Sequence, residues 1–186
     1  GAHVLAACRR NLDLTLIILN NFNFGMTGGQ YSATTPTDAV VGSEFLNQAE
    51  IPLDICAIAE SAGATYIDRC SGLDENLPGK IATAIEHKGF SIIETLGMCT
   101  GRYTKRNQLT PKILDQMIAD LPERSGVIEK NQRPEYGERY RALAKERNTF
   151  PEAVSIEKQI DIKDYQHQEV VILGSAGMRI VTAGDI

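Results

Sequence analysis

The sequence predicts an α/β domain with a mainly parallel sheet flanked by helices. A continuous apolar run at 14–19 is typical of a strand buried on both faces of such a sheet, and 90–96 has the pattern of a second buried strand. Segments with apolar residues at helical spacing alternate with strand patterns, and this order favours parallel pairing. With 186 residues, 42% of them apolar, the chain has the size of one domain, or of one domain with a fragment of another.

The first helix is expected to end at about residue 10, because apolar residues recur at near-helical spacing at Ala2, Val4, Leu5, Ala7 and Cys8. The apolar strand at 14–19 follows, and a polar loop rich in Gly, Thr, Ser and Asn then extends to about residue 50. Pro52 is placed at the start of the next helix, and Gly63 at its end, because these residue types suit those positions.

The same criteria place the remaining elements, in chain order, at 64–68 (strand), 77–87 (helix), 90–96 (strand), from Thr110 onward (helix), 135–148 (polar helix) and 169–173 (strand). Between 121 and 134 the pattern is charged and interrupted by two prolines, and 150–168 has the character of a linker. A glycine-rich turn at 174–177 is expected to begin a further helix.

Composition and charge exclude several classes of protein. No run of about 18 apolar residues is present, which argues against a transmembrane helix, and no apolar signal-peptide region is visible. We therefore expect a cytoplasmic protein with free thiols that does not bind membranes. A net charge of −5 argues against a general nucleic-acid binder.

The four cysteines do not form a compact metal motif, because no two of them have CxxC spacing. Cys8 and Cys56 fall in apolar helical patterns and are expected in the core, where free cysteines are common. Cys70 is likewise interpreted as structural. Cys99 differs, because it follows a buried strand.

The loop at 20–30, Asn-Asn-Phe-Asn-Phe-Gly-Met-Thr-Gly-Gly-Gln, begins where the first buried strand ends. Ligands of open α/β sheets bind outside the carboxyl ends of the strands. The glycines allow close approach of a ligand and leave N–H donors free, and the asparagine oxygens suit Mg²⁺ or Ca²⁺. The residues alone therefore indicate either a phosphate-and-magnesium loop or an ordinary Gly/Asn-rich turn.

Residues 20–36 resemble the thiamine-diphosphate loop of the β subunit of 2-oxoacid:ferredoxin oxidoreductases, most closely the 2-oxoglutarate type. The family pattern is close to N-x-x-Y-G-M-T-G-G-Q-x-S-P-T-T-P, and this chain has Phe24 for the Tyr and Ala33 for a Pro. The resemblance covers roughly 1–120, with Gly1-Ala2-His3 similar to the G-N-H that follows a G-D-G-D motif. It implies a thiamine-diphosphate-binding fold that is incomplete at both ends, with the G-D-G-D aspartate upstream of Gly1.

This resemblance implies roles for the loop residues. Asn21 would give its side-chain oxygen to Mg²⁺, and Asn23 its main-chain carbonyl. The cofactor's diphosphate is expected at Gly25, Met26 and Thr27, and the other residues expected near the cofactor are His3, Phe24 and Gly28. Because the family's charged ligand is absent, we expect this piece alone to bind the cofactor weakly and to be inactive. No side chain in it is expected to act as a catalytic nucleophile.

Cys99 resembles the family's cysteine in C-P-T-x-x-G-R-x-N, the fourth ligand of a [4Fe–4S] cluster whose other three cysteines lie nearer the subunit's N-terminus. Here the Pro is missing and Gly101 comes early, so a free loop thiol is the alternative. Beside it, Arg102, Lys105 and Arg106 form either a solvated surface or a site for an acidic partner such as ferredoxin. A CoA phosphate or a 2-oxoacid carboxylate would suit the same charges.

The domain organisation expected from these patterns has three parts. Residues 1–120 form the C-terminal part of the thiamine-diphosphate domain, 121–168 form a charged connector, and 169–186 begin a second α/β domain. The last part resembles the start of the family's γ subunit, I-x-G-x-G-G-Q-G-V-x-x-A-G, with Met178-Arg179 in place of Gln-Gly. A tight strand-to-helix turn of no special function is the alternative.

The resemblance implies an enzyme that converts a 2-oxoacid and CoA to acyl-CoA and CO₂ and passes electrons through the cluster to ferredoxin. An α-type subunit and a homo- or hetero-oligomeric assembly are implied with it. Two alternatives stay open: a thiamine-diphosphate enzyme of the decarboxylase or acetolactate synthase type without a cluster, and a non-catalytic scaffold fragment. Hydrolase and P-loop NTPase motifs are lacking.

Overall fold

The computed structural model describes residues 1–147 of the chain. Within this range the elements, in chain order, are α1 (Ala2–Arg10), β1 (Leu14–Asn20), β2 (Asn23–Phe24), β3 (Gln30–Tyr31), the 3₁₀ turn η1 (Leu46–Ala49), α2 (Ile55–Ser61), β4 (Tyr66–Ser71), α3 (Leu77–Glu86), β5 (Phe90–Leu96), α4 (Tyr103–Arg106), α5 (Pro111–Ala119), β6 (Ser125–Val127), the 3₁₀ turn η2 (Glu129–Asn131) and α6 (Tyr136–Arg147). The predicted mixed α/β class is confirmed.

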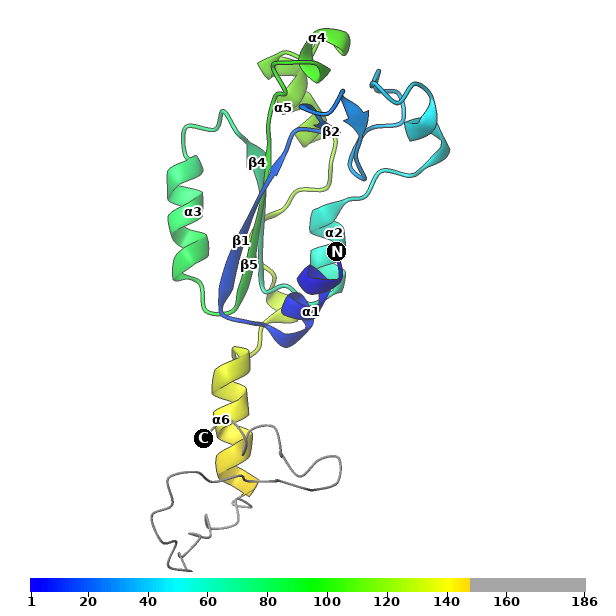
Figure 1. Cartoon of the computed structure of the whole chain (residues 1–186). Coiled ribbons are helices and arrows are strands. Elements are labelled where there is room, and N and C mark those ends of the chain that lie inside the picture. The colour runs from blue at the N-terminus through cyan, green and yellow to red at the C-terminus, as the bar shows by residue number, and fades with distance from the viewer. Residues whose placement is uncertain (148–186) are drawn as a thin grey trace, which may run out of the picture. The chain divides into compact units, whose positions relative to one another are not determined.

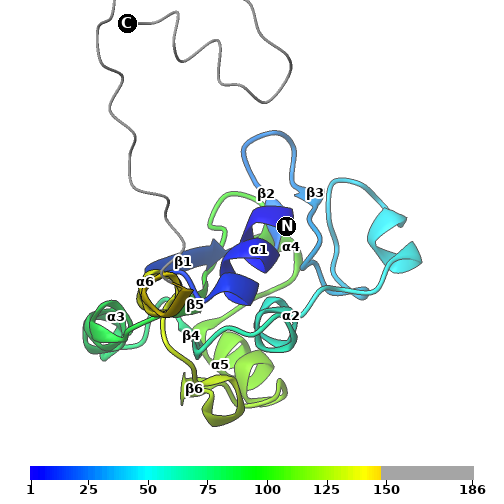
Figure 2. The same cartoon turned by 90° about the horizontal axis from the view of Figure 1, so that it is seen from below.

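The main sheet has four strands in the order β1-β5-β4-β6 (Figure 2). β1 and β4 both run parallel to β5, which lies between them, and β6 is antiparallel to β4. The register aligns Leu14 with Phe90 and Asn20 with Leu96, so β1 and β5 begin and end together. Their carboxyl ends therefore meet at one edge of the sheet.

Helices cover both faces of this sheet (Figures 1 and 2), with α1 and α2 on one side and α3 on the other. Side chains alternate along a strand, so neighbours on β5 enter different cores. Ile92 packs in the cluster that includes Cys8 of α1 and Cys56 of α2, while Ile93 packs with Ala84 of α3. The sheet is thus the middle of three layers.

A third core lies at the carboxyl end of the strands. Phe22, directly after β1, stacks on Tyr103 of α4 with ring centroids 5.5 Å apart. Leu96, Leu109 and Leu114 are buried in the same cluster. This cluster holds the loops that follow β1 and β5 against α4 and α5, and so gives the functional edge of the sheet a rigid base.

Asn11, which follows α1, connects three parts of the molecule. It has a left-handed backbone (φ 52°) and a fully buried side chain. Its Oδ1 accepts hydrogen bonds from Phe90 N (2.8 Å) and Thr65 Oγ1 (2.9 Å), and its Nδ2 donates to Arg133 O (3.0 Å) and Pro134 O (3.3 Å). One side chain thereby joins β5, the start of β4 and the segment before α6.

Several expected boundaries are confirmed and two are wrong. The strands at 14–19 and 90–96 and the helices beginning near 77 and 110 form as expected. The helix assigned to Pro52 instead begins at Ile55, because Asp54 caps it by accepting from Ala57 N at 2.9 Å. The strand expected at 64–68 extends to Ser71, because its pairing with β5 continues that far.

The expectation that the run 14–19 is buried on both faces is also wrong for the described structure. β1 is an edge strand there, paired with β5 alone. Leu14, Ile17 and Leu19 are consequently exposed, Leu19 by 80%. Leu16 and Ile18, on the side of the strand opposite to Ile17 and Leu19, pack against the core beneath α1 and α2.

The segment expected to be a charged connector contributes to the sheet, because β6 pairs with Tyr66–Asp68 of β4. α6 forms near the expected positions and buries none of its residues. The predicted linker at 150–168, the strand at 169–173 and the turn at 174–177 lie outside the described residues. Within the described part of the chain, no helix has both the length and the apolar character needed to cross a membrane.

Candidate functional site

Two loops meet at the carboxyl edge of the sheet because β1 and β5 are parallel neighbours. The loop after β1 begins at Asn21, and the loop after β5 begins at Gly97. Gly97 N donates to Asn20 O at 2.8 Å, so the two chains remain paired up to the point where they diverge. This edge is where ligands of open α/β sheets bind.

The first loop is folded into a hairpin made of β2 and β3. Gln30 closes its tip: Thr27 Oγ1 donates to Gln30 Oε1, and Gln30 Nε2 donates to Thr27 O, both at 2.8 Å. Gly28 and Gly29 have φ values of 131° and 77°, which side chains rarely adopt. Gly42 N donates to Gly29 O at 2.6 Å, and a Cβ at Gly42 would lie only 2.3 Å from Gly28 O. Glycine is therefore required at Gly28 and Gly29 and, where the chain passes close to them, at Gly42.

A cavity of about 860 Å³ lies between the two loops. It is lined by three residues of the first loop and seven of the second loop and α4: Asn21, Gly25, Met26, Met98, Cys99, Thr100, Gly101, Arg102, Lys105 and Arg106. Its three cationic side chains form no ion pair with any residue of the described part of the chain. The cavity therefore offers positive charge to an anionic ligand. The Asn21 side chain and the Cys99 thiol lie in the same lining.

Asn21 and Asn23 differ in exposure. Asn21 is exposed at the cavity, and its Oδ1 makes only a long contact of 3.5 Å with Asn23 N. Asn23 is buried, and its Oδ1 has no hydrogen-bond partner among the described residues. A buried amide oxygen without a partner is costly, so this atom has acceptor capacity that a bound cation or donor would use.

Cys99 is half-buried and lies against the first loop, since a Cβ at Gly25 would be 3.0 Å from its Sγ. Backbone N–H groups of Tyr103, Arg102 and Gly101, together with the Asn23 side chain, lower the pKa of the Cys99 thiol, although burial opposes them. Stabilisation of the thiolate is what a metal-binding cysteine needs. The geometry fits both a cluster ligand and a reactive free thiol.

The other three cysteines are buried, as expected from the sequence. Burial raises the pKa of Cys8 to about 11 and also raises the pKa values of Cys56 and Cys70. None of the three lines the cavity. Cys99 is thus the only cysteine of this sequence at the candidate site.

The structure brings most of the predicted site residues together. Asn21, Gly25, Met26 and Cys99 line the cavity, and the other loop residues adjoin it in the same hairpin: Asn23, Phe24, Thr27 and Gly28. Phe24 and Met26 are exposed. His3 is exposed on α1 and does not line the cavity.

Sequence reasoning gave no role to Asn20 or Glu94. Asn20 is the first member of the Asn-Asn pair, and its buried side chain contacts Glu94 of β5 and Thr34. Thr34 belongs to the motif at 20–36, so the sequence could have indicated that Asn20 and Thr34 lie close together. The sequence signal for Glu94 is weaker: it is the single charged residue in a segment with a buried-strand pattern.

Comparison with known proteins defines the class of this site. Residues 1–95 match the C-terminal TPP binding domain of the thiamine pyrophosphate enzymes, and the chain belongs to this family. Among more specific relatives, the 2-oxoglutarate synthase subunit KorB of Archaeoglobus fulgidus is 41% identical over 100 residues, covering 53% of this chain and 38% of the relative. The subunit of the same name from Methanocaldococcus jannaschii is 40% identical over 126 residues, covering 67% and 46%.

The chain therefore spans less than half the length of these two relatives. A solved structure with a similar fold is the 2-oxoglutarate:ferredoxin oxidoreductase from Magnetococcus marinus with 2-oxoglutarate, coenzyme A and succinyl-CoA bound. The TM-score is 0.61, with 20% identity, over 78% of this chain and 57% of that one. At this identity the likeness concerns the fold alone. The thiamine-diphosphate family predicted from residues 20–36 is confirmed by the family match, and the 2-oxoglutarate type predicted with it agrees with the names of these relatives.

Proposed function

We propose that this chain forms the thiamine-diphosphate-binding part of the β subunit of a 2-oxoacid:ferredoxin oxidoreductase, of the 2-oxoglutarate type. The whole enzyme would oxidatively decarboxylate a 2-oxoacid with CoA to acyl-CoA and CO₂, and reduce ferredoxin. The observation that supports this most is the meeting, at one cavity, of the Asn/Gly-rich loop with Cys99 and three cationic side chains.

The residues at this edge fit thiamine diphosphate with Mg²⁺. Asn21 has an exposed amide oxygen at the cavity; Asn23 is expected to contribute its main-chain carbonyl, and its buried side-chain oxygen has no partner among the described residues. Neutral oxygens of this kind suit Mg²⁺, which also takes phosphate oxygens as ligands. Backbone N–H groups of Gly25, Met26 and Thr27 are expected to bind the diphosphate. When bound, thiamine diphosphate supplies the group that stabilises the carbanion left by decarboxylation.

Cys99 fits one ligand position of a [4Fe–4S] cluster, which requires a thiolate. The hydrogen bonds that lower its thiol pKa also favour that form. The three other cysteines of the sequence are buried away from the cavity. The remaining ligands would therefore come from chain outside this sequence.

The partners follow from this assignment. We propose an α-type subunit, ferredoxin, CoA and a 2-oxoacid, in a homo- or hetero-oligomeric cytoplasmic enzyme. Arg102, Lys105 and Arg106 offer positive charge to the anionic members of this set. We also propose that the chain that follows the thiamine-diphosphate domain leads into the beginning of a γ-type domain at 169–186.

The test uses the complete complex that contains this chain. We expect about four irons per protomer in the wild type and loss of iron and of ferredoxin reduction in Cys99→Ser. Cys70→Ala is the matched control, since Cys70 is buried in β4 away from the cavity. Binding of thiamine diphosphate without iron would instead favour an enzyme of the decarboxylase or acetolactate synthase type, and absence of both would favour a scaffold.

A further inference from the structure

Asn20, the last residue of β1, connects the sheet to the cofactor loop through its side chain. Its Oδ1 accepts from Phe22 N at 3.1 Å and from Thr34 Oγ1 at 2.8 Å. Its Nδ2 donates to Glu94 Oε1 at 2.8 Å. The amide is 8% exposed, so water contributes little to its orientation.

The two hydrogen bonds to Oδ1 hold an unusual turn. Phe22 has a φ of 64°, a left-handed conformation that costs about 1–2 kcal/mol for a residue with a side chain. Asn20 Oδ1 binds its N–H, and the Thr35 hydroxyl donates to its carbonyl oxygen. The chain bends at Phe22, between Asn21 and Asn23, the two residues expected at the cation. The turn therefore decides where their oxygen atoms point.

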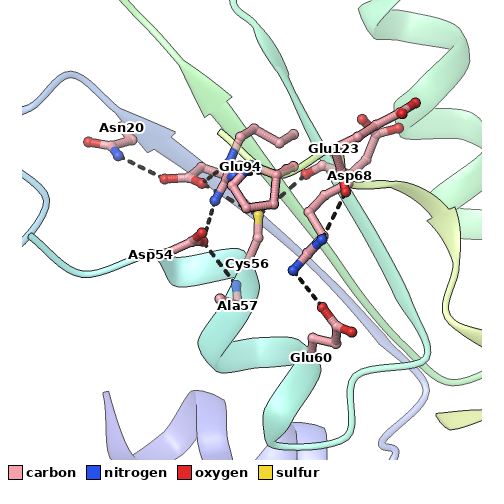
Figure 3. A network of polar contacts seen from close by, with 11 residues as sticks. Asn20, Asp54, Cys56, Ala57, Glu60, Asp68, Glu94 and Glu123 are labelled. Atoms are coloured by element: carbon pink, nitrogen blue, oxygen red, sulfur yellow. Dashed lines mark hydrogen bonds and ion pairs between the residues drawn. The ribbon is translucent and has the colours of Figure 1, made fainter. Parts of the chain in front are cut away.

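Glu94 is the group that sets the orientation of the Asn20 amide. It is 3% exposed, and its second oxygen, Oε2, accepts from Arg69 Nε at 2.9 Å and from Cys56 Sγ at 3.4 Å. Arg69 also pairs with Asp54, so the carboxylate is held in a fixed ionic network. Figure 3 shows the side chains of Asn20, Asp54 and Cys56 gathered around Glu94.

The chemistry of this network allows only one arrangement. A carboxylate accepts hydrogen bonds and cannot donate them, so it must face the NH₂ group of Asn20. If the Asn20 amide were rotated by 180°, its oxygen would face Glu94 and its NH₂ group would face the N–H of Phe22. Both contacts would be repulsive in a buried site.

We propose that Glu94 is a positioning residue for the cofactor loop: through the Asn20 amide, it fixes the direction in which residues 21–23 present their oxygen atoms to the cation. This inference rests on the proposed function for the identity of the ligand. The hydrogen-bonded link from Glu94 through Asn20 to the loop is present without any ligand, so this part of the inference is independent of the proposed function.

The test exchanges donor and acceptor between the two positions. Asn20→Asp sets two buried carboxylates against each other. In the double variant Asn20→Asp/Glu94→Gln, the NH₂ group of the introduced glutamine can donate to the introduced aspartate, while the glutamine oxygen still accepts from Arg69. The pair keeps one negative charge, so the double variant restores the hydrogen bond with the same net charge.

Two readouts are taken on the complete complex. Hydrogen exchange of peptides spanning 20–31 is measured without cofactor, and binding of thiamine diphosphate is measured by calorimetry at limiting Mg²⁺. We expect Asn20→Asp to accelerate exchange and to weaken binding by about tenfold or more, and the double variant to return both to within about threefold of the wild type. Glu94→Gln alone should have an intermediate effect.

Asp54→Asn is the control, because it weakens the same ionic network without touching Asn20. It should leave exchange of 20–31 unchanged. A double variant no better than Asn20→Asp would overturn the proposal. If Asn20→Asp does not fold, equal exchange in Glu94→Gln and Asp54→Asn would overturn it as well. A wild type that binds no thiamine diphosphate would count against the proposed function, while the exchange data would still decide the link.

Discussion

Replacing Gly25 by alanine should displace Cys99, because the two loops touch at this position. A Cβ at residue 25 would lie 3.0 Å from Cys99 Sγ, where ordinary contacts lie at 3.4–4 Å. The neighbour must therefore move by a few tenths of an ångström. Gly25 does not have a positive φ, so alanine adds no backbone strain there and the contact with sulfur is the main perturbation.

The consequence for the thiol can be estimated from its hydrogen bonds. Backbone N–H groups of Tyr103, Arg102 and Gly101 lower the pKa of Cys99, and displacement weakens at least one of them. Loss of one such bond costs about 1 kcal/mol, or about fivefold in the population of the thiolate. In the metal-free chain, alkylation of Cys99 by iodoacetamide at neutral pH should slow by about that factor. In the complete complex, iron retention should fall about tenfold or more.

Gly101→Ala is the matched control, because Gly101 lines the same cavity and its added Cβ would meet nothing within 4 Å. Alkylation is followed by mass spectrometry of the peptide that contains Cys99, with the three buried cysteines as internal standards. Equal alkylation rates and equal iron contents in the two variants would refute the reasoning about contact between the loops.

Three further predictions follow from the structure. Asn21→Ala in the complete enzyme should lower thiamine-diphosphate affinity about tenfold at limiting Mg²⁺, as measured by calorimetry. Because the side chain is exposed, the free energy of unfolding should change by less than about 0.5 kcal/mol. Unchanged affinity would exclude Asn21 as a ligand. Asn11→Ala should cost about 3–5 kcal/mol in urea unfolding, since two buried and two partly buried hydrogen bonds are lost and a left-handed position is strained. Asn11→Gly should recover about 1 kcal/mol of this. Burial lowers the pKa of His87 from 6.5, so the unfolded chain takes up a proton at a higher pH than the folded chain. The free energy of unfolding should therefore fall as the pH drops from 7.5 to 5.5. His87→Gln should flatten this dependence, and an equally steep curve would contradict the role given to His87.

Much of the fold was predictable because its elements have local signals. The apolar run that forms β5 and the helical spacing that forms α3 are visible within ten residues of sequence. The parallel order followed from alternation of such segments. A cavity lies beside residues 20–30, which form one continuous motif at the end of a strand, and the roles given to these residues stay predictions.

The remainder depends on contacts between residues far apart in the sequence. Nothing local indicates that Arg69 of β4 is buried between Asp54 and Glu94, the second of which lies 25 residues away. The apolar pattern of β1 predicts burial, but whether a strand is central or at an edge depends on its neighbours. Likewise, the approach of Gly25 to Cys99 arises only when β1 and β5 pair.

The Asn11 side chain has a consequence for the order of folding. Its four hydrogen bonds span 54, 79, 122 and 123 residues of sequence, so each of them joins segments that lie far apart along the chain. Closing such loops is entropically costly, so we predict that the Asn11 contacts form late, after the folding barrier. Substitutions at Asn11 should therefore leave the folding rate nearly unchanged and accelerate unfolding, which makes this residue a determinant of how long the folded domain survives.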